Sequence, residues 1–306
     1  MLGLGQGKGE MSSVPRDAAT VILLRDTPLG PEVFLVKRTG RAGFLANAMV
    51  FPGGCLDEAD LHPEWPDRCA DSLEDAARRL GLPSTQGTAA LALLVAGLRE
   101  TFEEAGLLIA RRGEALFSLE GSAEASHVFE LRAELNAGRL SFKDIVQRLE
   151  LHLATDALLY VARWITPEIE PKRFDTRFFM ARAFEGQEGR HDEQETTASA
   201  WMRPADVVSA CESGTLQLAP PTYRILLELA PLTDVEAALA SRAAQTPPTI
   251  APRFIDDDGR LSLLLPGDFQ YDGGQRDGGQ LDGGHSPVRN RISLQDGRWV
   301  SEGRGY

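Results

Sequence analysis

The sequence has few cysteines and a shortage of basic residues, and both features exclude classes of protein. Its 306 residues include three cysteines and no C-x-x-C pair, which excludes a disulfide scaffold and a zinc ribbon and suits a reducing compartment. Lysine and arginine total 32 against 45 aspartate and glutamate, a formal net charge of −13. Such a surface repels phosphate backbones and anionic lipid, so we expect neither nucleic acid nor a membrane as a partner. A small anionic substrate held through a metal ion is still allowed.

Long apolar segments are missing as well. The first twenty residues contain no apolar core of a signal peptide, and no stretch approaches the 18 apolar residues of a membrane span. Because these segments are missing, we expect a cytoplasmic protein.

No G-x-S-x-G motif is present, which removes support for a serine hydrolase.

The sequence mixes strand and helix signals within one continuous stretch. Short β-branched or aromatic runs between Pro and Gly predict strands, and apolar residues at helical spacing predict helices. The predicted strands are a run from residue 18 and residues 32–38, 48–54, 158–165, 176–184 and 195–202, and the predicted helices are 72–80, 89–105, 124–136, 142–151, 204–213, 222–229 and 234–244. Without regular βαβ alternation, this mixture favours the α/β (α+β) class. The fold is then either α+β or a layered α/β/α sandwich with a mixed sheet.

The domain organisation that we predict is one folded domain with appendages. Residues 1–16 are rich in glycine and polar groups, which predicts a disordered N-terminus. The folded domain covers 17–268 and includes a polar, partly helical insert at about 60–88 and a helical pair at about 124–151.

Residues 269–306 change in character and are predicted to be a Gly/Asp-rich flexible segment and a tail. An Asp-Gly-Gly unit recurs every five residues from Asp272, whereas calcium-binding glycine repeats have a nine-residue period. The segment R-I-S-L-Q-D-G-R-W-V at 291–300 is a candidate hairpin.

The segment L-R-E-T-F-E-E-A-G-L-L at 98–108 carries the most chemical information. Successive helical residues rotate by about 100°, so Arg99, Glu100, Glu103 and Glu104 share one side, opposite the apolar stripe. The glutamates repel one another by a few tenths of a kcal/mol per pair, and a hard cation such as Mg²⁺ or Mn²⁺ would offset that repulsion. The alternative is a solvated acidic helix face with Arg99 as its neutraliser.

These residues resemble the box of the Nudix hydrolases, G-x5-E-x7-R-E-U-x-E-E-x-G-U, where U is a bulky aliphatic residue. The matched positions of the second half are Arg99, Glu100, Glu103, Glu104, Gly106 and Leu107, with Thr101 in place of an aliphatic residue. The first half begins at Gly54, in the turn F-P-G-G, and has Asp60 in place of Glu. The spacer between the halves holds 38 residues instead of seven.

The long spacer is itself typical of one subgroup, the coenzyme A diphosphatase type of peroxisomes and its bacterial relatives. The phrases at 37–54, 163–167, 172–179 and 263–268 are also similar to that subgroup. The chain ends R-G-Y and lacks the small-basic-Leu peroxisomal address, which favours a cytoplasmic bacterial setting.

The resemblance implies a Nudix α/β/α sandwich that hydrolyses a nucleoside diphosphate linked to another moiety, with Mg²⁺ or Mn²⁺ as cofactor. It implies that Glu100, Glu103 and Glu104 bind the metal together with the Gly54 carbonyl, and that Arg99 orients the glutamates. One glutamate, for which we choose Glu100, doubles as a candidate general base.

Glu195 is a second candidate for the general base, because it resembles a family position outside the box. The alternative for Glu195 is ordinary strand or loop polarity. The candidate cations for the substrate phosphates are Lys37, Arg38, Arg41, Arg173 and Arg177, each with an ordinary surface charge as its alternative. Arg38 leads this set because it lies in the phrase that precedes F-P-G-G. Trp164 and Phe178 are either base-stacking or core residues.

Three functions remain open. The first is hydrolysis of coenzyme A or acyl-coenzyme A to phosphopantetheine or its acyl form and adenosine 3′,5′-bisphosphate. The second is hydrolysis of ADP-ribose, a dinucleotide or a capped RNA end, and the lack of proline between Pro83 and Pro167 counts against ADP-ribose. The third is a binding module without catalysis, although such modules usually lose box glutamates. Nudix enzymes often dimerise, and the added helices could supply the interface of a homodimer.

Overall fold

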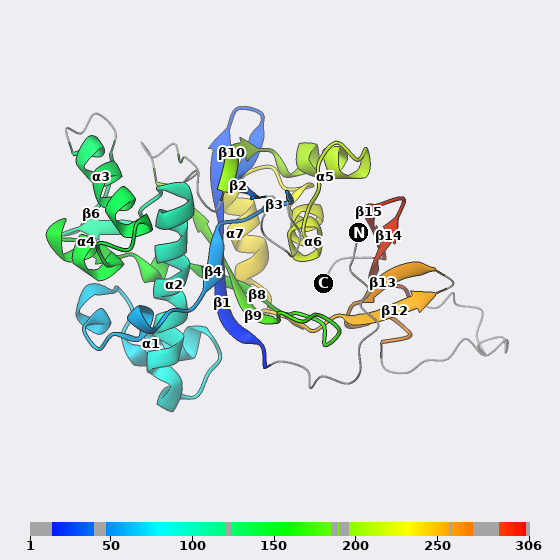
Figure 1. The fold of residues 1–306 in the computed structure, drawn as a ribbon, viewed down its shortest axis with the longest axis horizontal. Helices are drawn as coiled ribbons and strands as arrows, with labels where there is room; N and C mark the ends of the chain where they lie inside the picture. Colours follow the sequence, from blue (N-terminus) through cyan, green and yellow to red (C-terminus); the bar gives the residue numbers. More distant parts are fainter. Residues whose placement is uncertain are drawn as a thin grey trace.

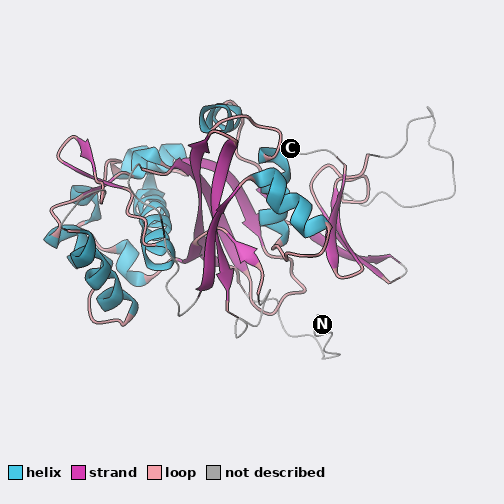
Figure 2. Ribbon diagram, turned by 90° about the horizontal axis from the view of Figure 1, so that it is seen from above, coloured by secondary structure: helices cyan, strands magenta, loops and turns pink. Residues whose placement is uncertain are grey.

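The computed structural model describes residues 14–39, 47–119, 124–184, 189, 196–257, 259–271 and 288–303. An eight-stranded sheet stands at the centre, with helices on both of its faces (Figures 1 and 2). Its strands are β1 (Arg16–Thr27), β2 (Gly30–Arg38), β3 (Met49–Val50), β4 (Gly53–Cys55), β8 (Leu159–Ile165), β9 (Phe174–Arg182), β10 (Thr196–Met202) and β11 (Thr249–Ile250). The layered sandwich predicted from the sequence is confirmed.

The sheet is mixed and runs in the order β10-β2-β1-β9-β8-β11, with β3 added to β2 and β4 added to β1. β1 is parallel to β9, and its two halves have different antiparallel partners: Leu24 pairs with Val33 of β2, whereas Ala19 pairs with Gly54 of β4. The single strand predicted at 48–54 is wrong. It splits around Pro52, which has no N–H for a ladder bond, and the chain crosses there from β2 to β1.

Alternating side chains of β1 separate two apolar cores. Ala19, Val21 and Leu23 face the first core, which contains α2, and Ile22 and Leu24 face the second core on the opposite side of the sheet. Helices α1 (Leu73–Arg79), α2 (Gly87–Ala105), α3 (Ala125–Asn136) and α4 (Phe142–Arg148) contribute to the first core, and α5 (Pro204–Glu212), α6 (Pro220–Leu229) and α7 (Val235–Ala243) to the second. Figure 1 shows these two groups on opposite sides of the sheet.

The helix boundaries follow the predicted caps closely. Ser72 caps α1 by accepting from the Asp75 amide, and Ser141 and Asp144 form a complete capping box on α4. α4 ends at Arg148 rather than the predicted residue 151, because Glu150 adopts a left-handed φ of 53° that no helix can continue through. Among the described residues no single helix is long and apolar enough to cross a membrane, and α1 with α2 passes that test only as a pair bent by 110°.

The insert that separates the two halves of the box is ordered. It contains α1 and three short 3-10 helices, η1 (Glu58–Leu61), η2 (Trp65–Arg68) and η3 (Ser84–Gln86). Trp65 is 2% exposed and packs on Phe142 of α4. A small sheet that the sequence did not predict lies beside it, in the order β6 (Ala115–Leu116), β5 (Ala110–Arg112), β7 (His152–Leu153).

The C-terminal segment forms a second sheet, of four antiparallel strands. Its strands are β12 (Arg253–Asp257), β13 (Arg260–Leu264), β14 (Arg291–Gln295) and β15 (Arg298–Glu302). The hairpin predicted at 291–300 is confirmed, but the domain boundary at 268 is wrong, because β13 pairs with β14 and a buried Asp268–Arg291 ion pair joins the two sides. The Asp-Gly-Gly repeat lies outside the described residues.

The N-terminal boundary also needs correction. β1 begins at Arg16, inside the segment 1–16 predicted to be disordered, because the Arg16 amide donates to the Arg173 carbonyl at 2.9 Å where β1 joins β9. Residues 1–13 lie outside the described part of the chain.

Candidate active site

The F-P-G-G segment is fixed on β1, directly beside the second half of α2. The Val21 amide donates to the Pro52 carbonyl at 2.9 Å, and the Gly53 amide donates to Oε2 of Glu104 at 3.0 Å. A Cβ atom on Gly53 would lie 2.4 Å from the Ala19 carbonyl oxygen, which is backbone and cannot move aside easily. The first glycine is therefore required by the close approach of two strands.

Gly54 is required for another reason. A Cβ atom there would lie 2.4 Å from Oε1 of Glu100 and 2.6 Å from Oε2. The carboxylate of Glu100 thus rests against the backbone of Gly54, and that of Glu104 bonds to the neighbouring peptide. Two of the three predicted metal ligands, Glu100 and Glu104, thus contact the glycine turn that contains Gly54, the residue of the predicted backbone ligand.

Arg99 joins the two halves of the box across the long spacer. Its Nε and Nη2 donate to the two carboxylate oxygens of Asp60, both at 2.9 Å, and Nη2 also donates to the Cys55 carbonyl at 3.0 Å. Asp60 is 2% exposed and also accepts from the Asp57 amide at 2.8 Å, closing the capping box of η1. The sequence showed Asp60 only as a departure from Glu, and its pairing with Arg99 was not predicted.

Arg99 also holds two of the glutamates. Its Nη1 donates to Oε1 of Glu100 at 2.9 Å and to Oε2 of Glu103 at 2.8 Å. Arg99 is 8% exposed and Glu104 9%, so the alternative of a solvated acidic helix face is wrong for these two residues. Burial alone would lower the pKa of Arg99, but the bonds to Asp60 and the charges of both glutamates raise it above its usual value. The guanidinium is therefore a permanent cation.

The residue types fit a hard divalent cation, although the side chains do not surround one. Within the described ranges, no three His, Cys, Asp or Glu side chains are grouped closely enough to hold a metal ion as they stand. Arg99 gathers Glu100 and Glu103 on one nitrogen, while Glu104 turns to the Gly53 amide. The donors are carboxylate and carbonyl oxygens, which Mg²⁺ and Mn²⁺ prefer. The box supplies four carboxylates and one guanidinium, a set whose mutual repulsion a divalent cation would reduce.

Arg177 lies on the same face of the sheet as the glutamates. Ala19 of β1 pairs with Gly54 on one side and with Arg177 on the other, so Arg177 is two strand spacings, roughly 10 Å, from the glycine turn. Its guanidinium is buried and forms ion pairs with Asp175 at 2.6 Å and Asp17 at 3.2 Å. A substrate phosphate would have to compete with these carboxylates.

The other predicted cations are more scattered. Lys37 and Arg38 end β2, where Lys37 is half-buried and pairs with Met49, and Arg38 is exposed. Arg173 precedes β9 and donates from Nε to the Thr166 carbonyl at 3.0 Å. Arg41 and Glu195 lie outside the described residues, so their assignments stay predictions.

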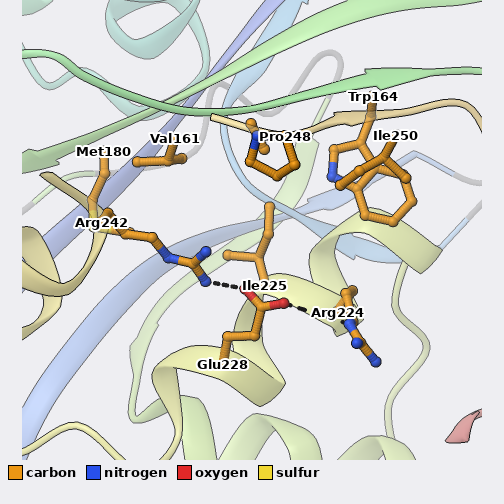
Figure 3. Close-up of a pocket in the computed structure, with 10 residues that line it drawn as sticks. Val161, Trp164, Met180, Arg224, Ile225, Glu228, Arg242, Pro248 and Ile250 are labelled. Carbon is orange, nitrogen blue, oxygen red and sulfur yellow. Dashed lines mark hydrogen bonds and ion pairs between the residues drawn. The ribbon is translucent and has the colours of Figure 1, made fainter. Parts of the chain in front are cut away.

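A small cavity lies on the opposite face of the sheet, between β8 and helices α6 and α7 (Figure 3). Glu228 bridges Arg224 and Arg242 in its wall, and the Trp164 ring borders it. Trp164 is 4% exposed and Phe178 6% within the second core, which supports the core interpretation of both aromatic residues. This cavity shares no residue with the box.

Comparisons with known proteins agree with the fold and the box. A family profile described as the NUDT19 Nudix domain matches residues 15–229. The acyl-coenzyme A diphosphatase NUDT19 of Gallus gallus is 28% identical over 305 residues, which cover 84% of this chain and 79% of the relative. The protein of the same name from Homo sapiens is 29% identical over 278 residues, which cover 79% of this chain and 72% of the relative.

A solved structure gives the same result. The Nudix hydrolase of Alicyclobacillus acidocaldarius superposes with a TM-score of 0.60 and is 29% identical, covering 74% of this chain and 96% of that one. The predicted Nudix fold and family are confirmed. The chain belongs to the NUDT19 Nudix domain family, a family of hydrolases that act on pyrophosphate bonds.

Proposed function

We propose that the chain hydrolyses the pyrophosphate of coenzyme A or acyl-coenzyme A, with Mg²⁺ or Mn²⁺ as cofactor. The products are phosphopantetheine, or its acyl form, and adenosine 3′,5′-bisphosphate. Two relatives at 28% and 29% identity carry the name acyl-coenzyme A diphosphatase, and the long box spacer and flanking phrases are similar to that subgroup. The observation that carries the proposal is the Arg99–Asp60 pair, because it joins the two halves of the box across a spacer of 38 residues.

The proposed metal ligands are Glu100, Glu103 and Glu104, with the Gly54 carbonyl. A bound divalent cation would neutralise pyrophosphate oxygens and polarise the attacking water. Arg99 orients Glu100 and Glu103 through charge-assisted hydrogen bonds of 2.9 and 2.8 Å. Glu100 and Glu195 are the two candidates for the general base, and comparing the pH–rate profiles of Glu100→Gln and Glu195→Gln distinguishes them.

The proposed phosphate contacts come from the end of β2 and from β9. Arg38 is exposed at the end of the strand that leads toward F-P-G-G, so it can reach a 3′-phosphate without leaving a buried partner. Arg177 lies across β1 from Gly54. Lys37, Arg41 and Arg173 complete the proposed set of cations.

Product identification tests the function. Purified protein with Mg²⁺ or Mn²⁺ is offered coenzyme A, acetyl-coenzyme A, ADP-ribose and NADH, and the products are identified by mass spectrometry. We expect adenosine 3′,5′-bisphosphate from the first two, and its loss in Glu104→Gln but not in the control Glu134→Gln, an exposed glutamate of α3. Cleavage of ADP-ribose or NADH alone would contradict the coenzyme A assignment. No cleavage of any substrate would favour the binding module.

The contact with the 3′-phosphate has its own test. Arg38→Ala should raise KM for coenzyme A with little change in kcat, because a phosphate contact remote from the reacting bond stabilises bound substrate and transition state alike. It should leave KM for 3′-dephospho-coenzyme A unchanged. Equal effects on both substrates would show that Arg38 does not read the 3′-phosphate.

The cytoplasmic location and the homodimer are also proposals. Light scattering of the purified protein tests the second: a mass of 33.3 kDa would be that of a monomer, and twice that mass would support the dimer.

A further inference from the structure

The C-terminal end of α2 is held by a residue from another helix. The last turn of α2 carries Glu103 and Glu104, and its final carbonyls have no partner within the helix. The Glu103 carbonyl accepts three hydrogen bonds from α3: from Arg132 Nε at 3.0 Å, from Arg132 Nη2 at 2.8 Å and from Asn136 Nδ2 at 3.2 Å. A guanidinium fork and an amide therefore converge on the backbone of one proposed metal ligand.

The position of Arg132 is specific rather than incidental. Arg132 is 6% exposed, and its guanidinium lies at the C-terminal end of α2. This is the negative end of the helix dipole, where a cation is favoured. Gly106 ends α2 with a φ of 70°, and a Cβ atom there would lie 2.9 Å from Nη1 of Arg132. The box glycine thus provides both the left-handed turn and the space that Arg132 occupies.

We propose that Arg132 is a positioning residue for Glu103 and Glu104. Its guanidinium fixes the last turn of α2, and with it the backbone positions from which the two carboxylates, which would hold the cation, leave the helix. This inference rests on the metal site proposed above. It gives the helical pair at 124–151 a function in the site, because α3 follows α2 in the chain and holds its last turn. Arg132 bonds to the backbone of Glu103, whereas Arg99 bonds to the carboxylates of Glu100 and Glu103.

Two measurements on the purified protein test this role. The first is amide hydrogen exchange over residues 102–108 in metal-free protein, and the second is the dissociation constant for Mn²⁺ by titration calorimetry. Arg132→Ala should accelerate exchange in that segment and weaken Mn²⁺ binding about ten- to a hundredfold, the range for residues that orient metal ligands. Arg132→Lys keeps the charge but loses the fork and should recover part of both effects.

The control is Arg139→Ala, which removes an exposed arginine just after α3 that pairs with Glu134 and should change neither measurement. If Arg132→Ala does not fold, Asn136→Ala removes a single donor to the same carbonyl and should change both quantities in the same direction. Folded variants with wild-type Mn²⁺ affinity would overturn the proposal, whatever their melting temperature.

Failure of the metal site itself would look different. Glu100→Gln is titrated in parallel. If wild-type protein binds no Mn²⁺, or if Glu100→Gln binds it as tightly as wild type, then the proposed metal site is wrong and this inference falls with it. If Glu100→Gln weakens binding and Arg132→Ala does not, only the role of Arg132 is wrong.

Discussion

Replacing Asp60 by Asn tests whether the Arg99–Asp60 pair holds the two halves of the box together. The side chain of Asp60 is 1% exposed and that of Arg99 is 10% exposed, and both nitrogen–oxygen distances are 2.9 Å. Asn keeps the volume of Asp but removes the charge, and it turns one acceptor into an NH₂ group that faces a guanidinium donor. Removing one partner of a buried pair costs about 3–5 kcal/mol, because the remaining charge stays buried. Because Arg99 keeps Glu100 and Glu103 as partners, we expect the free energy of unfolding to fall by less than that, by about 1–3 kcal/mol.

Asp60→Asn should also alter the positions of two proposed metal ligands, Glu100 and Glu103. Nη1 of Arg99 bonds Glu100 and Glu103, and its direction depends on Nε and Nη2 being held by Asp60. With that anchor lost, Mn²⁺ binding should weaken even at temperatures where the variant is folded. Asp60→Glu keeps the charge that Asp60→Asn removes and introduces the glutamate of the family box. It should therefore lose less stability than Asp60→Asn.

Urea unfolding followed by circular dichroism gives the free energy of unfolding, and titration calorimetry gives the Mn²⁺ affinity. Glu134→Gln is the matched control, because it breaks the exposed Arg139–Glu134 pair and should leave both values unchanged. If Asp60→Asn unfolds at the urea concentration of wild type, then the pair does not join the halves of the box and the reasoning is refuted.

Two further predictions concern other close contacts. Gly53→Ala should destabilise the fold by about 1–3 kcal/mol, since its Cβ meets the backbone of β1. The Cβ of Gly54→Ala meets only the carboxylate of Glu100, a side chain that Arg99 holds, so this change should cost less stability but weaken Mn²⁺ binding. Equal unfolding midpoints in urea would contradict this contrast. Asp268→Asn breaks a fully buried pair with Arg291 and should cost about 3–5 kcal/mol at pH 7. Although burial raises the pKa of Asp268, its hydrogen bonds from Arg291 and from backbone amides lower it overall. The pair therefore stabilises the protein above the unfolded pKa of about 3.9, and the cost measured by urea unfolding should shrink as the pH falls below that value; a cost independent of pH would refute this assignment.

The helices could be predicted because their signals are local. Apolar spacing and the C-terminal Gly106 located α2 within two residues at its start, and Ser141 with Asp144 located the start of α4. The strands β5, β6 and β7 were missed because each has two or three residues, too few for an alternating pattern to appear. The domain boundary at 268 was misplaced because the glycine-rich repeat suggested a tail, while the pairing of β13 with β14 is a contact across many residues.

The candidate site was predictable in its residue types but not in its contacts. The motif identified Arg99 and the glutamates, since their spacing on one helix is fixed by helical geometry. It could not identify Asp60 as the partner of Arg99, or Arg132 as the partner of the Glu103 carbonyl, because these bonds join residues 39 and 29 positions apart in the sequence. Only the packing of the insert and of α3 around α2 brings them together.

The long spacer within the box is tolerable on energetic grounds. For a flexible loop, lengthening the spacer from seven residues to 38 adds only about 1.5 kcal/mol of closure entropy, because this cost grows with the logarithm of length. The insert buries Trp65, which is 2% exposed, and Leu80, which is 7% exposed, in the first core, and burying one such side chain contributes about 1.5–3 kcal/mol. What the box requires is that both of its ends be fixed in space: the pairing of β4 with β1 fixes the glycine turn, and the bidentate bond to Asp60 fixes Arg99. The spacing of the first half to the second is therefore free to vary, whereas the spacing within the helix is not.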